Sequence, residues 1–301
     1  MKIHLAVAAF IGTTLLLSDG VHGYESHRST TSKSARQEAL RAIPLENLPK
    51  QYRQQVQTVL KQATLYRRLP TCVVDCHPDM FTYMARNPEV MVAIWRELGV
   101  SQVQLQRIGP NTFHLKDRAG TTGKLVLLEE QCEAGAQNRV IMLAEGSYES
   151  PPLSHPVKAQ CVFLLRSGSI KETNGRRFVA ARLDSFIRIE GASLQWFAKV
   201  LHPWVGTTAD RNFSDTLTFV GNLSKTAEVR PQAIGKLAGK LSEVSRTRQK
   251  QLVKLAYQCE DDLHRWKIVH KSQDKLHRAR LARFAETGGN VNADEAGVLK
   301  R

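Results

Sequence analysis

The spacing of apolar residues changes several times along the chain, and these changes predict the order of the elements. Between 78 and 98, apolar residues recur every three or four positions, which is typical of helices. Asn87-Pro88 interrupts the stretch, so we expect one short helix from Pro78 and a second from Pro88 to Leu98, closed by Gly99. A short strand over 68–75 precedes them, because Val73 and Val74 stand between two prolines.

After Gly99 the apolar period falls from about 3.6 residues to two, which favours strands. The predicted strands cover 102–107, 112–116, 124–129, 139–148, 157–166 and 177–190. Each is bounded by Gly, Pro, Asn or Ser, and the connections are short. Six successive strands with short connections predict an antiparallel meander.

The helical period then returns in a long amphipathic stretch of about thirty residues, for which Ser193 is a plausible N-cap. Pro203 lies inside it and should kink the helix, or divide it in two, near 202–206. Further helices are predicted at 48–67 and within 229–286. Residues 24–47 read as a flexible leader and 287–301 as a disordered tail, because both have little to bury.

A strand, two short helices, six strands and one long helix therefore follow each other between about Leu69 and Glu228. This order resembles the START-like superfamily (helix-grip, SRPBCC-type), whose members wrap a curved sheet around a long C-terminal helix and leave a cavity between them. The resemblance implies an α+β helix-grip domain over 68–228, with an antiparallel curved sheet of order β-α-α-β6-α and extra helices at both ends. The chain is also similar to a group of exported bacterial proteins of unassigned activity, in the segments Arg68-Leu-Pro-Thr-Cys-Val-Val-Asp75, Asn87-Pro-Glu-Val90 and Arg182-Leu-Asp-Ser-Phe186.

A bent sheet closed by one helix has room for an apolar ligand that a few polar groups orient, although a packed core is the alternative. The candidate cavity residues are Trp95, His114, Tyr148, Phe163, Arg182 and Asp184. Arg182 and Asp184 share one face of the last strand, where Arg182 would hold an anionic head group and Asp184 would orient it. The opposite face carries Leu183 and Ile187 and is the better core candidate, which favours placing both charges toward solvent.

Cys72, Cys76 and His77 form the most distinctive short segment. It is close to the Cys-x-x-Cys-His pattern of c-type haem attachment, with one residue too many, and a zinc site would need further ligands. On an extended strand the two cysteines stand about 13 Å apart, beyond the reach of a disulfide. We favour small buried strand residues and expect no cofactor or metal. A pairing of Cys132 with Cys161 across the sheet stays open.

The N-terminal residues are typical of a secretory signal. Lys2 precedes an apolar run from Ile3 to Leu17, and small residues lead to a cleavage point near Gly23. The run is shorter than the ~20 residues that cross a bilayer. We therefore expect export to the periplasm, the cell envelope or the medium.

The chain of 301 residues carries 43 Lys+Arg and 28 Asp+Glu, which gives 43 − 28 = +15. A hydrophobic share of 42% excludes collagen, disorder and a multi-span membrane protein. Residues 230–284 hold 14 Lys+Arg and 5 Asp+Glu, or +9. Such a helical segment would contact an anionic membrane surface or an envelope polymer. The alternative, which we favour slightly, is a solvated extension whose apolar side packs on the domain. Nucleic acid is an unlikely partner for an exported protein, and the oligomeric state stays open.

No Gly-x-Ser-x-Gly turn, phosphate loop or dinucleotide fingerprint is present. We therefore expect an exported, non-enzymatic protein that holds a hydrophobic or amphipathic small molecule under its long helix. The alternative is an envelope structural or interaction protein with a solid core, whose basic C-terminal helices make the contact. An enzyme similar to the cyclases of the same superfamily would need an acid or base inside the cavity.

Overall fold

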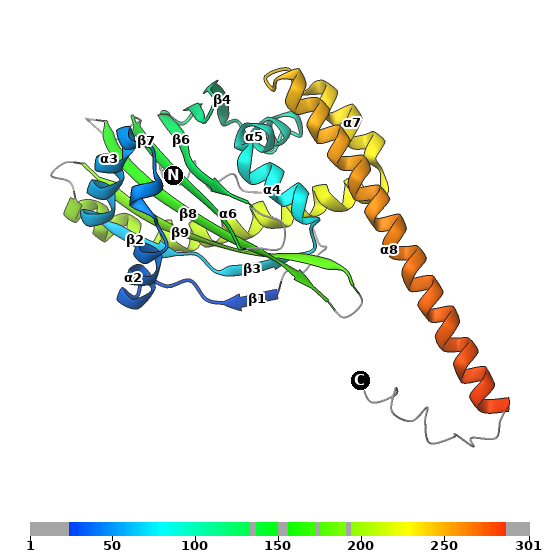
Figure 1. The fold of residues 1–301 in the computed structure, drawn as a ribbon. Coiled ribbons are helices and arrows are strands. Elements are labelled where there is room, and N and C mark those ends of the chain that lie inside the picture. The colour runs from blue at the N-terminus through cyan, green and yellow to red at the C-terminus, as the bar shows by residue number, and fades with distance from the viewer. Residues whose placement is uncertain (1–23, 133–136, 150–155, 173–174, 191–193, 287–301) are drawn as a thin grey trace.

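A computed structural model describes residues 24–132, 137–149, 156–172, 175–190 and 194–286, and within these the side chains of 24–27, 194–207 and 271–286 are not described. The predicted signal segment, the predicted tail and the expected N-cap at Ser193 lie outside the described residues. The fold is α+β, with one antiparallel sheet that carries helices on both faces (Figure 1).

The sheet contains nine strands in the order β1-β3-β9-β8-β7-β6-β5-β4, and β2 pairs separately with β9. The strands are β1 (Tyr24–His27), β2 (Leu65–Arg68), β3 (Thr71–Val74), β4 (Gln104–Gly109), β5 (Thr112–Lys116), β6 (Thr121–Gln131), β7 (Asn138–Tyr148), β8 (Val157–Lys171) and β9 (Arg177–Ile189). Each strand from β4 to β8 pairs antiparallel with the next one in the chain. The predicted six-stranded meander is therefore confirmed.

The helices are α2 (Lys33–Arg41), the short 3₁₀ helix η1 (Leu45–Asn47), α3 (Lys50–Lys61), α4 (Pro78–Arg86), α5 (Pro88–Glu97), α6 (Leu194–Val229), α7 (Pro231–Lys240) and α8 (Arg246–Glu286). The predicted pair of short helices is confirmed in α4 and α5. Proline occupies the first turn of both, and Gly99 follows α5 with a φ of 70°.

Two hydrophobic clusters cover the two faces of the sheet. Leu125 and Leu127 of β6 belong to a cluster with α4 to α8, whereas Val126 and Leu128 belong to a second cluster with α2 and α3. Alternate residues of a strand point to opposite faces, so β6 is buried on both sides. This double burial explains why β6, β7 and β8 read as nearly continuous apolar runs.

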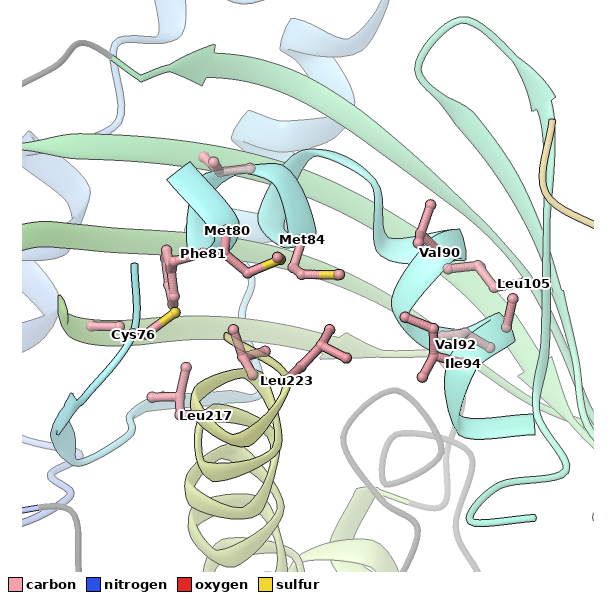
Figure 2. Close-up of a cluster of buried hydrophobic side chains, with 14 of the residues drawn as sticks. Cys76, Met80, Phe81, Met84, Val90, Val92, Ile94, Leu105, Leu217 and Leu223 are labelled. Carbon is pink, nitrogen blue, oxygen red and sulfur yellow. The ribbon is translucent and has the colours of Figure 1, made fainter. Parts of the chain in front are cut away.

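The cluster on the α6 face is filled from several elements. Figure 2 shows Met80, Phe81 and Met84 of α4 directed toward Leu217 and Leu223 of α6, with Val90 and Ile94 of α5 beside Leu105 of β4. These side chains are all buried. In this region the interior is a packed core.

Helix α6 comes very close to β3 at Gly221. A Cβ added there would lie 2.5 Å from Cγ2 of Val74 and 3.3 Å from the carbonyl oxygen of Asp75. Only glycine fits this contact without a shift of its neighbours. The helix also runs past Pro203 without interruption, so of the two expected outcomes the division into two segments is wrong, whereas the kink stays a prediction. A proline removes a single backbone hydrogen bond, and the turns on either side remain helical.

A glycine pair brings β6 and β7 together. Gly123 and Gly146 are cross-strand partners. An added Cβ would lie 2.8 Å from the carbonyl oxygen of Glu145 at the first position, and 2.7 Å from that of Thr122 at the second. Backbone atoms cannot rotate away, so this part of the sheet depends on two residues without side chains.

The N-terminal region differs from the sequence prediction. Residues 24–47 are not a flexible leader throughout, because they contain β1, α2 and η1. Helix α2 buries Ala35 and Ala39, and Ser32 caps it by accepting a hydrogen bond from the backbone N–H of Ala35. The predicted helix over 48–67 ends at Lys61, and β2 then pairs with β9.

The basic C-terminal region is partly core. Helix α7 and the first half of α8 contribute to the same cluster as the sheet, through Ile234, Ala238, Leu252, Ala256 and Cys259 among others. Beyond this, α8 projects away from the domain (Figure 1). Among the described residues, no helix is long and apolar enough to span a membrane.

Candidate functional site

The structure separates the predicted cavity residues into three groups. Phe163 is buried in the cluster on the α6 face, and Trp95 packs against that cluster. Tyr148 is buried at the end of β7, on the same side of the strand as Ala144 by alternation. His114 is exposed, because its neighbours Phe113 and Leu115 take the inward positions of β5. The placement of His114 inside a cavity is therefore wrong.

The surroundings of Arg182 and Asp184 match neither expectation. They do not point into the α6 face, where Leu183 and Ile187 are buried as the sequence favoured. Their side of β9 is also not solvent, because α2 and α3 cover it and Asp184 is 0% exposed. The expectation of a solvent face fails because it did not include a second layer of helices.

Asp184 is the centre of a buried ion network that we call the arginine cluster: Glu38, Tyr66, Arg68, Arg166, Arg182 and Asp184. Its Oδ1 accepts hydrogen bonds from the Tyr66 hydroxyl and Arg68 Nε, both at 2.7 Å, and its Oδ2 accepts one from Arg166 Nη2 at 2.9 Å. Glu38 of α2 accepts from Arg68, Arg166 and Arg182 at 2.7, 3.0 and 2.9 Å. A buried carboxylate with three donors is well compensated.

The cluster shifts the pKa values of its members. Burial alone would raise the pKa of Glu38, but hydrogen bonds from Arg68 and Arg166 and the charge of Arg182 outweigh it and lower this pKa to about 2. Burial and the hydrogen bond to Asp184 raise the pKa of Tyr66. The network thus ties α2 to β2, β8 and β9, and the low pKa of Glu38 keeps its carboxylate ionised at neutral pH.

Replacing Glu38 by glutamine should reduce the acid sensitivity of the fold. The pKa of Glu38 falls from 4.5 to about 2 on folding, so its carboxylate stabilises the native state above pH 4.5 and loses this contribution as the pH drops through about 2. The Glu38 side chain is 43% exposed, so solvent screening limits the difference in the free energy of unfolding to about 1 kcal/mol. Urea unfolding of both proteins at several pH values should show a difference at pH 7 that shrinks toward pH 2. A difference in the free energy of unfolding that stays the same from pH 7 to pH 2 would contradict this prediction.

Three polar residues of α5 and α6 have buried atoms, and we call them the α5–α6 polar set: Trp95, Asn212 and Asp215. Trp95 contacts Phe219 edge-on, with ring centroids 5.9 Å apart. Asn212 and Asp215 precede Phe219 on α6 by seven and four residues, so they occupy the same side of the helix. Among the described residues, Trp95 Nε1, Asn212 Nδ2 and Asp215 Oδ2 are buried atoms without a hydrogen-bond partner.

The charge of Asp215 is poorly compensated. Its nearest cation is Arg211, whose Nε lies 3.7 Å from Oδ2, an ion-pair distance that is too long for a hydrogen bond. Burial raises the pKa of Asp215 and the charge of Arg211 only partly opposes the shift. Buried polar atoms nearly always find partners in native proteins, so the three atoms of this set are candidates for hydrogen bonds to water or to a ligand.

A small pocket lies between β3 and α6, with a volume of about 20 Å³. This is room for about one water molecule. Its lining includes Cys72, Val74, Asp75, Leu217, Gly221 and Lys225. Asp75 there is already paired with Arg176 Nε at 2.9 Å and Lys225 Nζ at 3.4 Å. The pocket is therefore too small for an apolar ligand.

The cysteine segment is structural. Cys72 is a buried residue of β3, as favoured from the sequence, whereas Cys76 is buried but lies beyond the end of β3. Burial raises the pKa of Cys76 to about 12. Both ring nitrogens of His77 are engaged: Nδ1 accepts from the backbone N–H of Asp79, and Nε2 lies 2.8 Å from Asp262 Oδ2 on α8. A thiol so reluctant to ionise is a poor nucleophile and metal ligand.

The pairing of Cys132 with Cys161 is wrong, because both thiols are free. Cys161 stands in the cross-strand row of Ala144 and Leu125, whereas Cys132 follows the far end of β6. Seven residues of strand separate the two levels, or about 23 Å. Within the described residues, no group of three or more His, Cys, Asp and Glu side chains could hold a metal ion.

Sequence reasoning missed Asn212 and Asp215 because polar residues on an amphipathic helix are normally assigned to its solvent side. It missed Glu38, Arg68 and Arg166 because their partners are distant in the sequence. Neither family models nor curated proteins match this chain. Its function therefore has to be argued from its own residues.

Proposed function

We propose that the protein is an exported binding protein of the START-like, helix-grip type, which holds a small amphipathic molecule between α5 and α6. The order of elements and strands supports the proposal. β3, α4, α5, the meander β4–β9 and α6 follow one another, and β3 closes the sheet beside β9. The apolar side of α6 packs within the cluster on one face of this sheet, as a gripped helix does.

The observation that carries the proposal is the α5–α6 polar set. Trp95 Nε1 and Asn212 Nδ2 are donors without acceptors among the described residues, and Asp215 has a buried carboxyl oxygen one turn of α6 after Asn212. Leaving such atoms unpaired costs about 1–3 kcal/mol each, so a ligand that pairs with them is strongly favoured. The site therefore suits a molecule with one polar end that accepts two hydrogen bonds.

The apolar surroundings define the rest of the ligand. Trp95 and Phe219 present aromatic surface beside the polar atoms, and both pack against the large apolar cluster. Sites of this kind bind apolar bodies and use a few polar groups for orientation. Long-chain acids and alcohols have this chemistry.

The proposal is tested by extraction and by direct binding. Organic extraction of the purified protein, followed by mass spectrometry, should release an apolar molecule, and a fluorescent long-chain fatty acid should bind. Trp95→Phe and Asn212→Leu each remove one donor and should weaken binding about tenfold. Asn222→Leu is the matched control, because Asn222 is an exposed residue of the same helix. Absence of both a released molecule and fatty-acid binding would refute the proposal.

A further inference from the structure

Helix α8 changes its surroundings along its length. Cys259 is the last of its residues that is fully buried. Asp262 then contacts His77, and Trp266 and His270 stack on each other beside Gly175 in the β8–β9 turn. From 271 to 286 the helix continues for about 24 Å away from the domain (Figure 1). We call residues 264–286 the α8 arm.

The α8 arm is strongly basic. It contains 7 Lys+Arg and 2 Asp+Glu, a charge of 7 − 2 = +5, and three histidines in addition. Its charge is a third of the +15 of the whole chain, in fewer than a tenth of the residues. Such a density attracts an anionic partner and repels a second copy of itself.

Apolar side chains are exposed among these cations. Ile268 is 65% exposed and Val269 is 52% exposed, and Leu276, Leu281 and Phe284 follow in the sequence. A nucleic acid or a charged polymer would contact the cations alone, because neither offers an apolar environment for large aliphatic side chains. An anionic lipid surface binds both kinds of side chain, because the cations contact the head groups and the apolar side chains enter the acyl boundary.

We propose that the α8 arm docks on an anionic lipid membrane, with its helix lying in the interface. The domain would then stay in water, tethered through the first half of α8. The juxtaposition of exposed Ile268 and Val269 with Lys267 carries the inference, and the composition of the following residues extends it. The inference does not depend on a bound ligand.

Vesicle sedimentation with the full chain tests the proposal. The protein should bind vesicles of phosphatidylcholine with phosphatidylglycerol, and should not bind phosphatidylcholine alone. Lys267→Gln, Lys271→Gln and Lys275→Gln together should lower the partition constant roughly a hundredfold, from a free energy of about 1 kcal/mol per cation. Ile268→Ser with Val269→Ser should lower it roughly tenfold at unchanged charge.

Two matched controls separate docking from general effects. Lys33→Gln, Lys50→Gln and Lys61→Gln remove three exposed cations near α2 and α3, and Ile108→Ser removes an exposed apolar side chain from β4. Both should bind vesicles like the unmodified protein. Equal binding to neutral vesicles would overturn the proposal. Binding that is insensitive to Ile268→Ser with Val269→Ser would also overturn it, and would assign the arm to a partner recognised by charge alone.

Discussion

Replacing Asp184 by alanine is expected to lower the free energy of unfolding by about 3–5 kcal/mol, the largest single effect that we predict. The carboxylate is 0% exposed and accepts hydrogen bonds from Tyr66, Arg68 and Arg166. Its removal leaves two guanidinium groups under α2 with one fewer anion, and Glu38 alone cannot pair both fully. Urea unfolding at pH 7, followed by circular dichroism, measures the loss.

The matched control is Glu46→Ala. Glu46 also pairs with an arginine, Arg53, but its side chain is 92% exposed, so its loss should cost less than about 1 kcal/mol. Tyr66→Phe removes only one neutral donor and should cost about 1 kcal/mol. If Asp184→Ala were no more damaging than Glu46→Ala, the arginine cluster would not stabilise the sheet as described.

Replacing Gly146 by alanine should cost about 3 kcal/mol, at the upper end of the range for overpacking. The new Cβ would lie 2.7 Å from the carbonyl oxygen of Thr122 and 3.2 Å from Cα of Gly123. Relief requires β6 and β7 to move apart along their cross-strand row. Thermal and urea unfolding should both report the loss.

Gly168→Ala on β8 provides the comparison. A Cβ there meets nothing within 4 Å, so this change should be neutral or stabilising by about 0.5–1 kcal/mol. Equal stability of Gly146→Ala and Gly168→Ala would mean that the close approach of β6 and β7 relaxes without cost, against our expectation.

The parts of the fold that follow from local pattern could be predicted from the sequence. Period-two alternation located β4 and β5, apolar runs bounded by turn residues located β6 to β9, and helical spacing with prolines located α4 and α5. Within the meander each strand pairs with the next strand in the sequence, so this pairing needed no long-range information. This is why the meander was predictable.

The parts that depend on distant partners could not be predicted. β2 has four residues and is a strand because it pairs with β9, more than a hundred residues later. Helix α2 has a weakly apolar sequence and is ordered by Glu38 and by its contacts with the sheet. In both segments tertiary contacts, rather than periodicity, decide the structure.

The candidate site was predicted only in part, for a related reason. Trp95 follows the helical period of its segment and packs against the cluster on the α6 face, and Phe163 is buried within that cluster. From the sequence, the side chain of Asp184 was expected either inside a cavity or in solvent. In the structure a second layer of helices covers the face of β9 that carries it. The run Cys161 to Leu165 has no alternation, and such runs are typical of strands buried on both faces. β9 pairs with β8, so the same signal predicts that the face of β9 that carries Asp184 is also covered by protein.

The contact between Gly221 and Val74 has a consequence for the movement of α6. Leu217 and Lys225 lie one turn away on the same side of α6 as Gly221. A displacement of α6 along its own axis would carry one of these side chains toward Val74, into the space that only a glycine fits. The contact therefore fixes the position of α6 along the sheet.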